Sequence, residues 1–190
     1  MLKKYSRLFI GVTTSLLLLA CSTEKLKYSI DPEIANIGQL AGKAKLVSLS
    51  VTNQTPDTIE GLKKDLIIAS GPKEPAKALR EKILDQLKAN NFKIINNPLL
   101  ADLSLSFTVE SLYATVDTGM FKSEINAISH LRVKVKKQGK TFEKVYRNSR
   151  KQEVANPANE LDVTGIVNQV LSQQMSAIFT DPKLLELTNG

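Results

Sequence analysis

Apolar and polar residues alternate along three stretches of the chain, which predicts β-strands that each bury one face. The clearest alternation covers residues 103–110, a second covers 125–135, and a shorter one covers 44–52. Beyond Val109 the apolar positions change parity. We therefore expect either a β-bulge at that point or a region that is covered on both faces.

A tight hairpin is predicted at Gln138–Gly139, after the stretch 125–135, because glycine readily adopts the positive φ that such loops need. With a two-residue loop, Val135 faces Phe142 on the core side of the strand pair. Lys134 then faces Glu143 on the other side. Residues 103 to about 155 are thus expected to form long antiparallel strands in succession.

Two segments have apolar residues at helical spacing instead. Residues 73–90 carry an apolar stripe with charged residues elsewhere, and Pro75 suits the first turn. A second stripe begins after Asn159, which can cap the helix, and Asp181–Pro182 ends it. Both segments are predicted to be amphipathic helices that each lay one face on a sheet.

These elements predict an α+β fold. Short apolar runs at residues 66–69 and 92–95 add two less regular strands. The economical arrangement is a mostly antiparallel sheet of about four to five strands with the two amphipathic helices packed on one face. The other face of the sheet is then left in solvent and available to a partner.

The N-terminus has the order of a secretory signal peptide. Three cations, Lys3, Lys4 and Arg7, precede a mostly apolar run from Leu8 to Leu19. That run is shorter than the roughly 20 apolar residues that a membrane-spanning helix needs. We therefore expect residues 1–20 to be removed.

The residues around Cys21 resemble a bacterial lipoprotein signal, with Leu18, Leu19, Ala20 and Ser22 as the recognition residues. The resemblance implies that the Cys21 thiol receives a diacylglyceryl group, that the chain is cut before Cys21, and that the new amine is acylated, for example with palmitate. More than one acyl chain gives stable membrane anchoring. Ser22 in place of aspartate resembles the sorting pattern for the outer membrane.

The mature chain is long enough for one domain. We expect the lipidated Cys21 and a flexible tether over residues 21–43, followed by a single periplasmic α+β domain over residues 44–190. The signal holds three of the 26 Lys and Arg and none of the 19 Asp and Glu, so the mature net charge is +4. That charge is too small to indicate nucleic-acid binding. With Cys21 lipidated no thiol remains, so the fold has no disulfide.

The chain also resembles the YajG family of Gram-negative lipoproteins. The resemblance lies in residues 79–84, residues 111–116 and the turn that follows them, Tyr146–Arg147, and residues 166–171. It implies an outer-membrane lipoprotein of undefined activity, with no catalytic residues to carry over. The order of elements is also similar to that of lipopolysaccharide-assembly lipoproteins of the LptE type, an analogy of topology alone.

The sequence contains few candidate catalytic residues and no catalytic motif. His130 is the only histidine and no cysteine remains free to join it, so we expect no metal site of the zinc kind. A general base must be oriented by a third group, and a solvated or stacked His130 is the simpler interpretation. Nucleophile-elbow, phosphate-loop and zinc-protease motifs are absent from the sequence. We expect no enzyme activity and no cofactor.

Charge is distributed unevenly along the chain. Between Arg132 and Lys151 there are nine Lys or Arg and one acid, Glu143. One interpretation is a charged edge hairpin that resists strand-to-strand aggregation. The other is a basic surface for an anionic partner such as lipid head groups, lipopolysaccharide phosphates, peptidoglycan carboxylates or an acidic protein. The candidate residues of that surface are Arg132, Lys134, Lys136 and Arg147.

Together the patterns predict an outer-membrane lipoprotein of the cell envelope that faces the periplasm and binds or helps to assemble an envelope component. Its expected partners are the membrane, through the lipid, and an anionic envelope component or an outer-membrane protein. An LptE-like structural partner of an outer-membrane protein is the alternative. A peptidoglycan or lipid hydrolase is a less favoured one.

Overall fold

The computed structural model describes residues 26–34, 40–56, 66–68 and 74–189. The regular elements in chain order are β1 (Leu46–Asn53), β2 (Leu66–Ile68), α1 (Glu74–Ala89), β3 (Lys93–Ile94), the short 3-10 turn η1 (Pro98–Leu100), β4 (Leu103–Thr118), β5 (Lys122–Lys137), β6 (Lys140–Ala155), α2 (Glu160–Phe179) and α3 (Pro182–Asn189). The predicted α+β class is confirmed, with α3 as an additional short helix.

One mixed sheet organises the fold, with strand order β3-β1-β4-β5-β6 and β2 paired to β4 beside this path. The three long strands β4, β5 and β6 are antiparallel. β1 pairs in parallel with both β3 and β4. A parallel neighbour requires a crossover connection, and the segment that contains α1 lies between β1 and β4 in the chain.

The β4–β5 ladder shifts register between Val109 and Ser111, so the predicted parity change is a β-bulge. The bulge lets Val109 and Leu112, three residues apart, both point into the core. The predicted two-residue hairpin between β5 and β6 is also confirmed. Gln138 and Gly139 have φ of 47° and 79°, and the expected partners of the flanking residues lie opposite one another.

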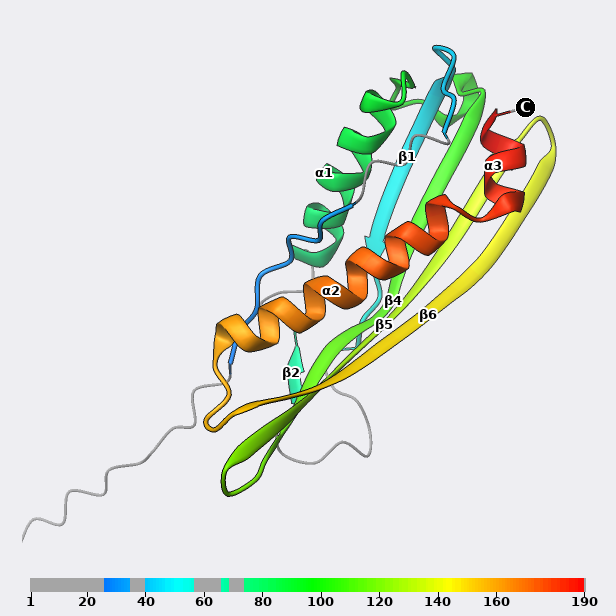
Figure 1. Cartoon of the computed structure of the whole chain (residues 1–190). Helices are drawn as coiled ribbons and strands as arrows, with labels where there is room; N and C mark the ends of the chain where they lie inside the picture. Colours follow the sequence, from blue (N-terminus) through cyan, green and yellow to red (C-terminus); the bar gives the residue numbers. More distant parts are fainter. Residues whose placement is uncertain (1–25, 35–39, 57–65, 69–73, 190) are drawn as a thin grey trace, which may run out of the picture.

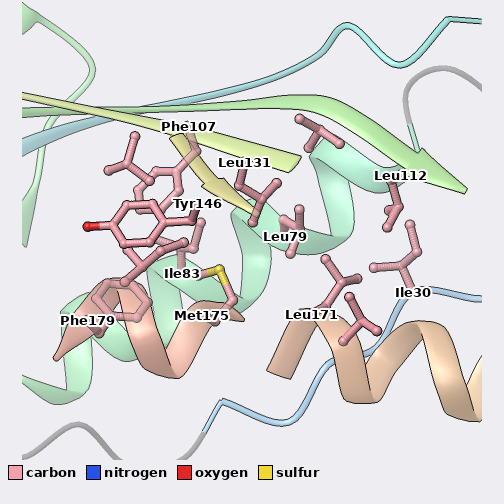
Figure 2. Close-up of a cluster of buried hydrophobic side chains, with 14 of the residues drawn as sticks. Ile30, Leu79, Ile83, Phe107, Leu112, Leu131, Tyr146, Leu171, Met175 and Phe179 are labelled. Atoms are coloured by element: carbon pink, nitrogen blue, oxygen red, sulfur yellow. The ribbon is translucent and has the colours of Figure 1, made fainter. Parts of the chain in front are cut away.

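Both long helices cover the same face of the sheet (Figure 1). Their apolar stripes meet the inward side chains of β4 and β5 in one continuous core. Figure 2 shows the centre of this core, where side chains from α1 and α2 pack against those of the strands. The fully buried large residues at this centre include Leu79, Ile83, Phe107, Leu131, Leu171, Met175 and Phe179.

The start of α2 is capped as predicted. The Asn159 side chain accepts hydrogen bonds from the backbone N–H groups of Leu161 and Asp162, and the Asp162 carboxylate accepts one from the Asn159 N–H. This reciprocal capping box satisfies donors that have no partner within the helix.

Replacing Asn159 with alanine is expected to lower the free energy of unfolding by about 1 kcal/mol, because the side-chain acceptor is lost. Urea unfolding followed by circular dichroism measures this change. Asn159→Asp is the control and should retain most of the stability, because aspartate caps helices as well as asparagine does. Equal losses in the two variants would show that the cap is not the cause.

The predicted tether is wrong for the part of it that the structure describes. Residues 26–34 lie along α2, and Tyr28 and Ile30 are buried in the core. The Tyr28 hydroxyl donates to the Leu112 carbonyl at 3.2 Å. Asn168 of α2 accepts from the Asp31 N–H at 2.8 Å and donates to the Ser29 carbonyl at 3.1 Å. The domain therefore begins well before residue 44.

Residues 40–45 are also fixed to the domain, at the C-terminal end of α1. The Gly42 N–H donates to the Asn90 carbonyl at 2.9 Å. A Cβ on Gly42 would lie 2.4 Å from that carbonyl oxygen, so only glycine fits this close approach. The remaining tether residues, 21–25 and 35–39, lie outside the described residues. In the described part of the chain, no helix combines the length and apolarity needed to span a membrane.

Candidate functional site

The candidate site is the face of the sheet opposite the helices, which we call the open face. None of the described helices lies over it (Figure 1). Side chains that point to this face alternate with the buried core residues of β4 and β5. The open-face side chains at its centre are Ser48, Ser50, Thr52, Ser104, Ser106, Thr108, Glu110, His130, Arg132, Lys134, Lys136, Thr141, Glu143, Val145 and Arg147.

Strand register divides the open face into a hydroxyl half and a charged half. One cross-strand row reads Ser50, Ser106, Lys134 and Glu143 from β1 to β6. On β1 and β4 the hydroxyls pair across the parallel ladder. Ser48 donates to Ser104 at 3.0 Å in a neighbouring row. The charged side chains lie on β5 and β6, together with Glu110 of β4.

Arg132 stands at the centre of an ion-pair network on the charged half. Its Nε donates to Glu110 Oε1 at 2.6 Å and its Nη1 to Glu143 Oε1 at 2.9 Å. Lys134 Nζ lies 2.9 Å from the other oxygen of Glu143. Hydrogen bonds from Lys134 and Arg132 lower the pKa of Glu143, and those to Glu143 and Glu110 raise the pKa of Arg132. The charges of Arg132 and Lys134 are therefore largely balanced within the network.

The nine cations of residues 132–151 do not share one face. Since the β5–β6 ladder has no register shift, parity places Lys137, Lys140, Lys144 and Arg150 on the helix side. The four predicted surface residues, Arg132, Lys134, Lys136 and Arg147, do lie on the open face with Lys151. Lys151 pairs with Glu124 at 2.8 Å.

Lys136 and Arg147 are exposed, and within the described residues neither has a carboxylate partner. Arg147 lines a shallow groove of about 370 Å³ together with Ile128, His130, Asn148 and Ser149. His130 lies directly opposite Arg147 in the β5–β6 ladder. Among the described cations on the open face of β5 and β6, these two are the ones whose charge remains available to an anion.

The other predicted site residues lie outside the described residues: Leu18, Leu19, Ala20, Cys21 and Ser22. No group of three or more His, Cys, Asp or Glu within the described ranges could hold a metal ion. Glu110, which bonds to Arg132 together with Glu143, was not predicted as its partner from the sequence. Its signal was its place in the alternating stretch, because Thr108 lies opposite Arg132 and Glu110 is the next residue of β4 on the same face.

Solved structures with a similar arrangement share little sequence with this chain. One, from Helicobacter pylori, is described as a "putative neuraminyllactose-binding hemagglutinin homolog", with 15% identity and a TM-score of 0.48, covering 82% of this chain and 94% of that one. Another is a PelC dodecamer from Paraburkholderia phytofirmans, with 16% identity and a TM-score of 0.38, covering 72% and 92%.

A third is lipoprotein GNA1162 from Neisseria meningitidis, with 10% identity and a TM-score of 0.36, covering 72% of this chain and 99% of that one. No curated protein matches the chain in sequence. A protein-family model described as "Uncharacterized lipoprotein" matches residues 58–187. Since this match spans more than half of the sequence, the chain belongs to that family of uncharacterised lipoproteins.

Proposed function

We propose that this protein is a YajG-type outer-membrane lipoprotein that is anchored through Cys21, faces the periplasm, and uses its open face to bind an anionic envelope component without catalysis. The family assignment supports the lipoprotein part of the proposal. The signal-like residues 18–22 support the anchor and the sorting.

The observation that carries the binding proposal is the uncovered, polar open face. It combines rows of Ser and Thr hydroxyls with two cations, Lys136 and Arg147, that are free of carboxylate partners among the described residues. Hydroxyls both donate and accept hydrogen bonds, and a guanidinium can bind phosphate or carboxylate in a bidentate manner. An extended polymer that carries hydroxyls and anionic groups matches this surface in chemistry.

The surroundings of His130 favour binding over catalysis. Its neighbour across the β5–β6 ladder is Arg147, and both line the groove with Ile128 and Ser149. A general base works when a third group accepts its second ring proton and orients it. Arg147 is a donor only and cannot take that role.

Photo-crosslinking in cells tests the binding proposal. A photoreactive residue at Ser106 or Lys134 on the open face is expected to give an adduct with lipopolysaccharide or another anionic glycan. The same residue at Arg150, on the helix side of β6, is the control and should give no such adduct. An adduct from the open face with an outer-membrane protein instead would overturn direct envelope binding and favour the LptE-like structural role.

Charge reversal at the two available cations is a sharper form of the test. In a chain with the probe at Ser106, the double change Lys136→Glu and Arg147→Glu is expected to reduce the yield of the adduct at least tenfold. The reason is that each site loses on the order of one charge-assisted hydrogen bond to the anion. The control is the double change Lys140→Glu and Arg150→Glu, which alters the net charge equally but on the helix side of the sheet. It should leave the yield of the adduct unchanged. Equal reduction by both pairs would mean that only overall charge matters, and would contradict a specific open-face site.

A further inference from the structure

The tip of the β4–β5 hairpin exposes two large apolar side chains. Met120 is 84% exposed and Phe121 is 85% exposed. Leu161, in the first turn of α2, is 82% exposed. The other large apolar side chains with high exposure among the described residues, Leu99 and Leu100, lie in η1 before the opposite end of β4. β4 has 16 residues, so about 50 Å separates its two ends.

Hydrogen bonds join the hairpin tip to the start of α2. Asn156, in the loop between β6 and α2, donates from its side-chain amide to the Gly119 carbonyl at 2.9 Å. The Ser123 hydroxyl donates to the same side chain at 3.1 Å. Figure 1 shows the hairpin tip and the first turn of α2 at one end of the elongated domain, with α3 at the other. The three exposed apolar side chains therefore belong to one end of the molecule.

The chain enters the domain at this same end. The backbone N–H of Lys27 donates to the Glu160 carboxylate, in the first residue of α2, at 3.1 Å. Leu26, where the described chain begins, is the fifth residue after Cys21. Five residues span at most about 18 Å when fully extended. A lipid on Cys21 therefore holds this end of the domain close to the bilayer.

We propose that the hairpin tip, Met120 and Phe121, inserts into the interface of the bilayer that holds the Cys21 lipid, with Leu161 at its margin. The inference rests on the lipid anchor of the proposed function. Two apolar side chains bind a membrane weakly by themselves, but the anchor makes their contact intramolecular and raises their effective concentration at the surface. The partner is thus a lipid surface and not a second protein.

The contact is apolar in nature. Lys122 and Lys151 near the tip are already paired, with Glu153 at 2.5 Å and with Glu124 at 2.8 Å. Paired cations add little attraction to anionic head groups. Insertion therefore needs no anionic lipid, and it directs the long axis of the sheet away from the membrane, with Leu99 and Leu100 at the distal end.

The absence of tryptophan from the sequence allows a direct test. The full lipidated chain carrying Phe121→Trp is reconstituted into vesicles of phosphatidylcholine, with or without bromine on the acyl chains as a quencher. We expect a blue-shifted emission and at least a twofold loss of intensity with the brominated lipid. Leu99→Trp is the matched control at the distal end. Its emission should stay that of a water-exposed indole and lose little intensity.

Flotation of the same vesicles separates the two ways in which the inference can fail. If the protein floats with the vesicles but Phe121→Trp is quenched no more than Leu99→Trp, the anchor stands and the insertion of the tip is refuted. If the protein does not float, the lipid anchor itself is refuted, and the insertion with it. Because both sites are highly exposed, neither substitution should disturb folding.

Discussion

Replacing Phe179 with alanine is expected to lower the free energy of unfolding by about 3–5 kcal/mol, as for other fully buried phenylalanines. Phe179 is the last residue of α2 and is only 1% exposed. Its ring centroid lies 6.2 Å from that of Phe107 on β4, within the range of separations at which aromatic rings interact. Figure 2 shows this ring beside Tyr146 and Met175, so its removal leaves a cavity between α2 and the sheet.

Phe121→Ala is the matched control, because it deletes the same atoms from a ring that is 85% exposed. It should change stability by no more than about 0.5 kcal/mol in the lipid-free chain. Urea unfolding of both variants, followed by far-ultraviolet circular dichroism, measures the difference. Comparable losses in the two variants would show that the α2–sheet contact does not hold the fold together.

The sequence predicted the structure correctly where each contact depends on residues that are close together in the chain. The two-residue loop at Gln138–Gly139 fixes the whole β5–β6 register, because every later pair follows from the first. The α2 stripe that ends at Phe179 was predictable for the same reason, since helical spacing alone decides which side chains are buried.

Contacts between distant parts of the chain could not be read in the same way. Residues 26–34 show neither a helical nor a strand period, yet Lys27 bonds to Glu160 and Asp31 to Asn168, across more than 130 residues. The parallel pairing of β1 with β4 is similarly non-local. The spacing of apolar residues predicts that a segment has an apolar face, but it does not indicate which distant element covers that face.

The residues of the candidate site were also only partly predictable, because their positions depend on how distant strands pair. The sequence indicated a cluster of cations, but a strand distributes alternate residues between two faces. Only the register assigns Lys136 and Arg147 to the open face and Lys140 and Arg150 to the other. The Glu110–Arg132 pair depended on the β4–β5 register. The sequence therefore placed the cations on one hairpin and overestimated the charge that its open face presents.

Asp181 holds together three elements at the junction of α2 and α3. Its side chain is 8% exposed, and Oδ2 accepts from Lys144 Nζ at 2.6 Å and from the Tyr146 hydroxyl at 2.9 Å. Oδ1 accepts from the Lys183 N–H at 3.0 Å. Burial alone would raise the pKa of Asp181, but these hydrogen bonds together keep that pKa below its ordinary 3.8. Burial and the bond to Asp181 raise the pKa of Tyr146.

Asp181→Asn is expected to lower the free energy of unfolding by about 2–3 kcal/mol at pH 7, because it removes the charged acceptor of Lys144 and Tyr146. A lowered carboxyl pKa stabilises the fold above pH 3.8, and that contribution is lost as pH falls through the lowered value. The raised pKa of Tyr146 stabilises the fold below pH 10, and that contribution is lost as pH rises above 10. Urea unfolding from pH 3 to pH 11 should therefore show the stability of wild type falling at both extremes, and the gap between wild type and Asp181→Asn narrowing at the acid extreme. Tyr146→Phe should remove the loss of stability above pH 10 and keep the loss below pH 3.8. A stability difference between wild type and Asp181→Asn that is constant with pH would contradict the role of Asp181.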